Sequence, residues 1–304
     1  MPELPEVETL RKGLAAAAAG KAIAGVEVRL PKVVSVGHAT VSNIRKTTRG
    51  VVKKFESMLA HKKILAVRRR AKLLMVDLSG GLVLLVHLKM TGQLIFAKKG
   101  ERKKVKFFNR GNSPQAILPH KYTHVIFTFT DGSRLYFNDL RQFGYLRLVR
   151  DEDIGKVREL QEFGPEPLSK DFTLRYLLDK SKKRPGISIK QFLMEPKVVA
   201  GIGNIYSDEI LFEAKLKPTR PVSRVTNQEF GAIYKSIPKV LKKAIKVQGS
   251  SVGDFFTVDG SEGKFGKQHK VYGWAGKACY NCGEIIESVK LGGRTSSFCP
   301  HCQK

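Results

Sequence analysis

The chain begins with Met1-Pro2-Glu3-Leu4-Pro5-Glu6-Val7-Glu8-Thr9-Leu10. If Met1 is removed, Pro2 becomes the amino terminus and carries a secondary amine, which no internal residue can supply. An α-amino group has a pKa near 8, whereas the lysine side chain has a pKa of about 10.4, so more of it is neutral and nucleophilic at neutral pH. Attack of this amine on an aldehyde or a sugar carbon would form an iminium ion. Glu3 could then deliver a proton to a leaving group or an opening ring.

The same residues also have a purely structural interpretation. Pro5 suits the first turn of a helix, and Glu6 and Glu8 complement the positive end of the helix dipole. We therefore expect a helix from about Pro5 that continues through the alanine-rich stretch Leu14–Ala19. That helix end, together with a neighbouring cation, would also lower the pKa of a terminal amine. The first ten residues alone leave both interpretations open.

The composition indicates a folded protein with a polyanionic partner. The chain has 304 residues, which is long enough for two domains with at least one sizeable core. Its hydrophobic content of 42% is typical of a folded protein. Lys and Arg total 55 against 27 Asp and Glu, so the net charge is +28. Nucleic acid is the partner that such an excess favours, and an anionic membrane surface is the alternative. The chain lacks a run of about 20 apolar residues, so we expect no membrane span.

The four cysteines form two close pairs, Cys279-x2-Cys282 and Cys299-x2-Cys302. This spacing is typical of a four-cysteine zinc site, and a tetrahedral set without an open position predicts a structural ion. Two disulfides are the alternative, which a reducing compartment disfavours. The acidic residues near the start argue against a secretory signal, so we expect a cytoplasmic protein. His301 lies between two ligands and is expected to be a bystander.

The hydrophobic pattern predicts a β-rich first half and a helical second half. Val149–Phe163 is charged and helical in pattern and is interpreted as a linker, and Lys98–Tyr122 as a long loop. The expected strands are Ile23–Leu30, Leu73–Leu78, Leu82–Leu88, Val125–Thr130 and Leu135–Phe137, with weaker candidates at Val51–Leu59 and Ile64–Val67. The expected helices are Thr173–Leu178, Ile187–Met194, Ile205–Ala214 and Asn227–Val247.

Several single residues are also candidates for chemistry. Gly201 and Gly203 allow a tight turn, and Asn204 is suited to cap the helix that follows, whose N–H groups could hold a phosphate. An ordinary turn between helices is the alternative. Without further information, Lys72 would be interpreted as a solvated surface charge. His87 would be interpreted as a structural histidine.

Six separate motifs resemble bacterial formamidopyrimidine-DNA glycosylases, and they occur in the expected order from Pro2 to Lys304. The motifs are Pro2–Thr9, Arg69–Leu74, His87–Gly92, Asn138–Gly144, Val198–Phe212 and the segment from Cys279 to Gln303. Leu140 and Gln142 stand where the family has proline and arginine, and Glu195-Pro196 replaces a more usual acidic-plus-glutamine pair. Gln248–Gly273, which contains Ser250, Ser251 and Asp254, is similar to the family's lesion-capping loop.

The resemblance implies a role for each matched residue. Pro2 would be the nucleophile, Glu3 the acid that protonates the sugar, and Glu6 a residue that orders the terminus or a water. Lys72 would approach the lesion nucleotide and its phosphate. The remaining implied DNA contacts are phosphate contacts by His87, Asn204 and Arg294, and wedges or base probes at Met90, Arg141 and Phe143. For Phe143, a core position at the end of a strand is the structural alternative.

The resemblance implies an α+β multidomain fold. We expect an N-terminal catalytic β-sandwich with flanking helices (1–148), a linker (149–163), a helix-two-turns-helix domain (164–250), a lesion-capping region (251–270) and a zinc-finger hairpin (271–304). The implied activity is excision of oxidised purines from double-stranded DNA followed by cleavage at the abasic site, by a nucleoid-associated monomer with one structural Zn²⁺.

Two other functions remain open at this point. One is a pyrimidine-specific glycosylase similar to endonuclease VIII. The other is a catalytically silent DNA-damage-binding zinc protein, against which the presence of Pro2, Glu3 and Lys72 argues.

Overall fold

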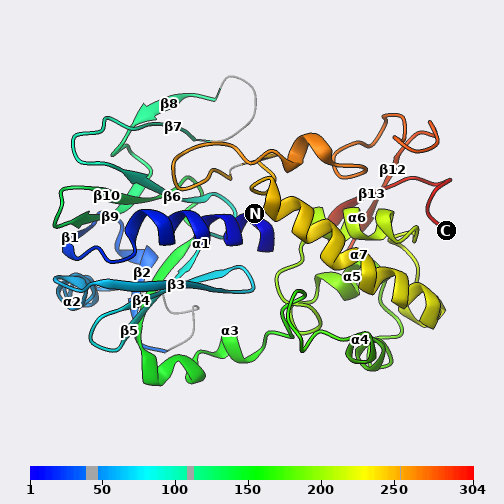
Figure 1. Cartoon of the computed structure of the whole chain (residues 1–304), viewed down its shortest axis with the longest axis horizontal. Helices are drawn as coiled ribbons and strands as arrows, with labels where there is room; N and C mark the ends of the chain where they lie inside the picture. The colour runs from blue at the N-terminus through cyan, green and yellow to red at the C-terminus, as the bar shows by residue number, and fades with distance from the viewer. Residues whose placement is uncertain (39–46, 108–112, 254) are drawn as a thin grey trace. The chain divides into compact units, whose positions relative to one another are not determined.

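The structure is a computed structural model that describes residues 1–38, 47–107, 113–253 and 255–304. It divides into two compact units (Figure 1). The first contains Met1–Gln161 and Gln248–Lys264, and the second contains Glu162–Val247 and Phe265–Lys304. The segment after Val247 therefore returns to the first unit before the chain re-enters the second.

Two sheets form the first unit. One has the strand order β1 (Ile23–Val28), β9 (Thr123–Phe129), β10 (Arg134–Asp139) and β6 (Gly92–Ala97). The other has the order β2 (Val34–Val36), β11 (Tyr145–Arg150), β5 (Leu82–His87), β4 (Leu73–Leu78) and β3 (Ile64–Arg70). Only the β11–β2 pair is parallel among these described strands.

One hydrophobic core joins the two sheets. Val86 and Leu146 of one sheet share it with Phe127 and Phe137 of the other, and each of these side chains is at most 2% exposed. The helix α1 (Leu4–Ala18) contributes Leu10 and Leu14 to the same core. The expected β-sandwich with flanking helices is thus confirmed.

Val51–Leu59 was expected to be a weak strand, and this prediction is wrong. The residues lie in the helix α2 (Arg49–Leu59), which buries Phe55 and Leu59. These two residues are four positions apart, so they share one face of a helix. Thr48 caps the helix by accepting a hydrogen bond from Val51 N–H. The packed face and the cap decide for a helix.

The Lys98–Tyr122 region contains a hairpin within its described part, where only a loop was expected. Strands β7 (Lys104–Lys106) and β8 (Gln115–Ile117) pair in antiparallel register. Val105 and Leu118 are buried with Ile95, Tyr136 and other residues on the outer face of the four-stranded sheet. This small core holds the hairpin against the sheet. Residues 108–112 lie outside the described residues.

The second unit is helical, as expected, and ends in a hairpin. Its helices are α4 (Leu174–Ser181), α5 (Ile189–Met194), α6 (Asn204–Glu213) and α7 (Asn227–Lys246), and its strands are β12 (Glu287–Leu291) and β13 (Arg294–Phe298). The short helix α3 (Arg158–Gln161) closes the first unit. None of the described helices is long and apolar enough to cross a membrane.

Candidate active site and zinc centre

Pro2 and Glu3 are buried immediately before the first residue of α1. Met1 precedes them and is 39% exposed. The Glu6 carboxylate accepts hydrogen bonds from Glu3 N–H at 2.8 Å and from Ser250 N–H at 2.7 Å. Each bond satisfies a backbone donor that burial has removed from water. Glu6 therefore fixes both the start of the chain and the start of the 248–264 segment.

Gly249 is necessary for this contact. Its φ is +77°, and a Cβ at this position would lie 2.7 Å from Glu6 Oε1. A larger residue would combine backbone strain with a clash against the carboxylate. The close approach of segment 248–264 to α1 thus depends on this glycine. Asp254, which was named in the lesion-capping region, lies outside the described residues.

Lys72 and His87 lie at adjacent ends of paired strands. Lys72 directly precedes β4, whose first residue, Leu73, pairs with His87 at the end of β5. Burial holds the pKa of His87 well below its ordinary value, and the charges of Lys89 and Lys72 lower this pKa further. His87 is therefore neutral at neutral pH. Because Lys89 N–H donates to His87 Nδ1 at 3.0 Å, the ring proton is on Nε2, which can donate to an anion.

The turn that carries Lys72 is tied to α1. Arg69 of β3 donates to the Glu8 carboxylate at 3.1 Å, and to the carbonyl of Ala71 at 2.9 Å. Burial alone would raise the pKa of Glu8, but hydrogen bonds from Arg11 and Arg69 outweigh it and lower this pKa. The ionised Glu8 thus links the helix that begins beside Pro2 to the strand that leads to Lys72.

Met90, Arg141 and Phe143 lie at the same end of two neighbouring strands. Met90 is two residues before the start of β6, and Arg141 is two residues after the end of β10. Gly92 and Asp139 form a register pair at this end. Phe143 is 50% exposed, and the Arg141 guanidinium lies 4.8 Å from the centre of its ring. The alternative that Phe143 is a core residue is therefore wrong.

A buried carboxylate organises the loop that presents these side chains. Asp139 is fully buried and accepts hydrogen bonds from Gly144 N–H at 2.7 Å, from Arg141 N–H at 3.2 Å and from the Thr91 hydroxyl. Gln142 has a φ of +56°, a left-handed conformation that costs free energy in a non-glycine residue. Sequence reasoning missed Asp139, although its place in the Asn138–Gly144 motif was visible.

In the second unit, Asn204 does not cap α6 as expected. Gly203 is the N-cap residue, and Asn204 is the first residue of the helix. Its side-chain amide donates to the carbonyl of Thr295 at 3.1 Å, so it lies next to the residue that follows Arg294. Gly203 has the extended backbone that an N-cap residue adopts, and glycine is among the residues that occupy this position. The structure thus brings Asn204 and Arg294 into the same neighbourhood.

Arg294 is exposed at the start of β13, after the turn Gly292-Gly293. Both glycines have positive φ values, +53° and +75°, as a two-residue hairpin turn requires. The hairpin expected within residues 271–304 is therefore present, with Arg294 next to its turn.

Two acidic residues of α6, which sequence reasoning did not single out, fix the hairpin and its preceding loop. Asp208 is buried, forms an ion pair of 2.7 Å with Lys190, and accepts from the Ser296 hydroxyl and Ser297 N–H. Glu209 accepts three backbone N–H bonds, from Lys270, Val271 and Tyr272. The signal that could have identified Asp208 and Glu209 is the position of two charged residues in the middle of a buried helix.

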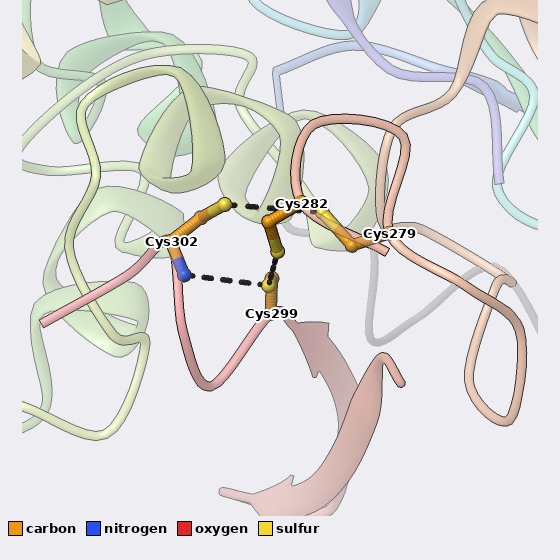
Figure 2. A group of neighbouring side chains, drawn as sticks. All are labelled: Cys279, Cys282, Cys299 and Cys302. Atoms are coloured by element: carbon orange, nitrogen blue, oxygen red, sulfur yellow. Dashed lines mark hydrogen bonds between the residues drawn. The ribbon is translucent and has the colours of Figure 1, made fainter. Parts of the chain in front are cut away.

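The four cysteines come together at the base of this hairpin (Figure 2). All four Sγ atoms lie within 4.8 Å of one another, with 3.5 Å between Cys282 and Cys299 and 3.9 Å between Cys279 and Cys302. Zn–S bonds of about 2.3 Å in a tetrahedron place sulfur atoms roughly 3.8 Å apart. Backbone N–H groups of Asn281 and Cys302 point at the Cys279 and Cys299 sulfurs. The residues fit one structural zinc ion.

Family models match three successive parts of the chain. Residues 1–146 match the formamidopyrimidine-DNA glycosylase N-terminal domain, and residues 163–255 match the H2TH domain of the same enzymes. Residues 276–304 match a zinc finger found in FPG and IleRS. This order of modules is that of a DNA repair glycosylase with a structural zinc finger.

Whole-length comparisons agree with this class. The formamidopyrimidine-DNA glycosylases of Pelotomaculum thermopropionicum and Carboxydothermus hydrogenoformans are each 39% identical over 304 residues, which is 100% of this chain and 99% and 100% of theirs. A solved Lactococcus lactis Fpg in complex with DNA containing an abasic site has a TM-score of 0.83 and 30% identity, and covers 99% of both chains. A complex of the L. lactis enzyme with Fapy-dG-containing DNA has a TM-score of 0.82, 30% identity, and coverage of 99% of this chain and 100% of that one. The chain belongs to the formamidopyrimidine-DNA glycosylase family.

Proposed function

We propose that this protein excises oxidised purines, such as 8-oxoguanine and formamidopyrimidines, from duplex DNA and then cleaves the abasic site through Pro2. The position of Pro2 carries the proposal, because it lies in the buried end of the chain that Glu6 orders. The similar L. lactis complexes, which contain abasic-site and Fapy-dG DNA, support this substrate class.

After removal of Met1, the Pro2 nitrogen attacks the sugar C1′ of the damaged nucleotide. The bond from C1′ to the base breaks, and its electron pair leaves with the base, which takes up the proton that the Pro2 nitrogen loses. Glu3 protonates the ring oxygen, so that the sugar opens and C1′ becomes part of a Pro2 iminium ion. The positive helix end and Lys72 are the two features that favour the neutral amine before attack.

The iminium withdraws electrons from the adjacent C2′, which loses a proton. Elimination then breaks the C3′–O bond, and the electron pair leaves with the 3′ phosphate. In a second elimination, C4′ of the resulting conjugated system loses a proton and the C5′–O bond breaks, with its electron pair leaving on the 5′ phosphate. Water finally hydrolyses the iminium and restores the Pro2 amine, which leaves a one-nucleotide gap in the DNA.

The remaining site residues bind and deform the duplex. Four residues contact phosphates: His87 through Nε2–H, Asn204, Lys72 and Arg294. These contacts supply affinity for DNA without sequence preference. Met90 fills the space left by the extruded base, Arg141 probes the partner base, and Phe143 enters the stack. The exposure of Phe143 supports its assignment, because a buried ring could not reach a base step. The zinc ion holds the hairpin and takes no part in the bond changes.

Borohydride trapping tests the proposal. Borohydride reduces an iminium to a stable amine, so incubation with an abasic duplex should join the protein covalently to DNA. Digestion and mass spectrometry should then place the adduct on Pro2, with Met1 absent. A protein that only binds damaged DNA would yield no adduct, and an active enzyme that retains Met1 would exclude Pro2 as the nucleophile.

A comparison of two damaged duplexes tests the substrate. Cleavage should be faster for 8-oxoguanine than for thymine glycol under identical conditions. The opposite preference would assign the protein to the pyrimidine-specific type. Leu140 and Gln142 make this test informative, because both lie in the loop that presents Arg141 and Phe143.

A further inference from the structure

A second cationic region of the first unit lies outside the site described above. The stretch Lys98-Lys99-Gly100-Glu101-Arg102-Lys103-Lys104-Val105-Lys106 has six cations and one acidic residue. It connects β6 to β7 and includes β7 itself. Arg134 of β10 lines the same open hollow as Lys98, Lys99 and Arg102. We call Lys98, Lys99, Arg102, Lys104 and Arg134 the outer basic surface.

Hydrogen bonds hold this surface in a defined conformation. The Glu101 carboxylate accepts from Lys98 N–H at 2.9 Å, and Glu101 N–H donates to the Lys98 carbonyl at 3.1 Å. Leu118 N–H donates to the Lys103 carbonyl at 2.9 Å, and Val105 is buried beneath the hairpin. An ordered set of charges loses less conformational entropy on binding than a flexible basic tail would.

Among the described residues, the ion pairs of this stretch involve Lys103 and Lys106 and not the outer basic surface. Lys103 pairs with Glu101, and Lys106 pairs with Glu262. Within the part of the chain that the structure describes, none of the five residues of the outer basic surface has an acidic side chain as an ion-pair partner. A group of uncompensated, ordered cations attracts a polyanion.

The register of β6 and β10 locates this surface relative to Met90, Arg141 and Phe143, which we call the wedge residues. Gly92 pairs with Asp139 at the end that presents Met90, Arg141 and Phe143. Ala97 pairs with Arg134 at the other end of the same two strands. Five residue steps of about 3.3 Å separate the two ends, so the distance is roughly 17 Å. This equals about five base-pair steps of duplex DNA, at 3.4 Å each.

The chain between the two ends is also basic and tied to the wedge end. The side-chain amide of Gln93, next to Gly92, donates to the carbonyls of Lys106 and Phe107 at 3.3 Å. Strand β7 therefore runs from the outer basic surface back toward the wedge residues. Lys104 and Lys106 project from the face of β7 opposite Val105, which is buried. Lys104 and Lys106 thus lie on the stretch of β7 that leads from the outer basic surface toward Gln93.

We propose that the outer basic surface binds the phosphate backbone of duplex DNA beyond the base pairs that the wedge residues contact. This inference rests on the proposed function in taking DNA as the partner. The surface contacts backbone only, so it adds affinity for any sequence and makes binding more salt-dependent. It lengthens the DNA segment that the enzyme covers and leaves the chemistry at Pro2 unchanged.

The test is the salt dependence of binding to undamaged duplexes of two lengths. One duplex has about 10 base pairs, one helical turn, and the other has about 30. The variant is Arg102→Gln/Lys104→Gln/Arg134→Gln. The matched control is Arg49→Gln/Lys53→Gln/Lys54→Gln, which removes the same charge from exposed positions of α2. Anisotropy titrations at several salt concentrations give the slope of log K against log salt.

The variant should lower the magnitude of this slope on the long duplex by about 2 to 3, because each lost phosphate contact contributes about 0.9. The short duplex should show a much smaller change, and borohydride trapping on a short abasic duplex should proceed at the wild-type rate. The control should keep the wild-type difference between the two duplexes. The proposal would be overturned if the variant left the slope on the long duplex unchanged or changed the slopes on both duplexes equally. It would also be overturned if the control variant changed the slope on the long duplex as much as the test variant did. A wild-type protein without an iminium adduct would instead refute the proposed function, since these slopes are measured on undamaged DNA.

Discussion

The Glu6 carboxylate accepts a hydrogen bond of 2.7 Å from Ser250 N–H, although 244 positions separate the two residues in the chain. The same carboxylate accepts from Glu3 N–H. The end of the chain that carries Pro2 and the first residues of the 248–264 segment are therefore ordered by one side chain. A change at Glu6 should disturb both together.

Replacing Glu6 with Gln should slow borohydride trapping far more than it weakens DNA binding. The amide places an NH₂ group opposite one of the two N–H donors, which leaves that donor unsatisfied and costs about 1–3 kcal/mol. Urea unfolding measures this loss, and trapping rates measure the chemistry. Glu56→Gln is the control, because Glu56 accepts a single backbone bond, from Val28 N–H at 2.9 Å. Equal trapping rates in the two variants would contradict an ordering role for Glu6.

Replacing Pro2 with Gly should weaken abasic-site cleavage and spare binding. Glycine supplies a primary amine, so an adduct can still form, but the secondary amine that gives a permanently charged iminium is lost. Single-turnover cleavage of an abasic duplex and anisotropy with the same duplex separate the two effects. Cleavage at the wild-type rate would remove Pro2 from the mechanism.

Replacing Asp139 with Asn should disorder the loop that presents Arg141 and Phe143. The variant sets an NH₂ group against the N–H of Gly144 or Arg141, which should lower the free energy of unfolding by about 1–3 kcal/mol. Base extrusion should slow, as measured with a fluorescent base analogue next to the lesion. Asp131→Asn is the control, since Asp131 accepts from Ser133 N–H at the opposite end of the same hairpin. Normal extrusion in the Asp139 variant would show that other contacts hold the loop.

The low pKa of His87 predicts a dependence of stability on pH. Burial and the charges of Lys89 and Lys72 hold this pKa below the ordinary 6.5. Below about pH 6.5 the unfolded chain therefore binds a proton that folded His87 does not, so stability falls as pH falls through this range. Urea unfolding above and below pH 6.5 measures the loss. His87→Gln should reduce the pH dependence of the free energy of unfolding, while His120 and His124 titrate as before. If this pH dependence is unchanged in the variant, it arises from His120 and His124 instead.

Replacing Asp208 with Asn should reduce DNA affinity while zinc remains bound. Loss of one partner from the buried Lys190–Asp208 pair leaves an uncompensated charge, which typically costs about 3–5 kcal/mol. The hairpin is then no longer held in a fixed position on α6, so Arg294, which lies on the hairpin, is no longer positioned to contact DNA. Arg294→Ala provides the comparison, since it should lower the salt slope by about 1 without the loss of stability. Zinc content measured by mass spectrometry should stay at one ion per chain, and its loss would assign the effect to the metal site.

The sequence predicted those features that depend on residues close together in the chain. The helix after Pro5, the successive strands at Leu73–Leu78 and Leu82–Leu88, and the convergence of the four cysteines all follow from local spacing. The helices α5 to α7 follow from their periodic apolar residues in the same way. The site residues were indicated by resemblance, and their individual roles stay proposals.

Other elements were missed because their partners are distant in the chain. Strands β6 and β11 were not predicted, and each pairs with a strand more than 35 residues away, β10 and β5. Val51–Leu59 became a helix because Phe55 and Leu59 meet the sheet core. Local propensity differs too little between helix and strand to decide such cases, and burial decides them.

The sequence by itself therefore determined the class of protein and the zinc ligands, and it indicated Pro2 as the proposed nucleophile. Only the tertiary structure decided what holds these parts in place. Three buried contacts between a carboxylate and a donor are not revealed by a local pattern: Glu6 with Ser250, Asp139 with Thr91, and Asp208 with Lys190. Such contacts form because chain folding removes each group from water, and an unpaired polar group in that environment would cost more than the ordering of its partner.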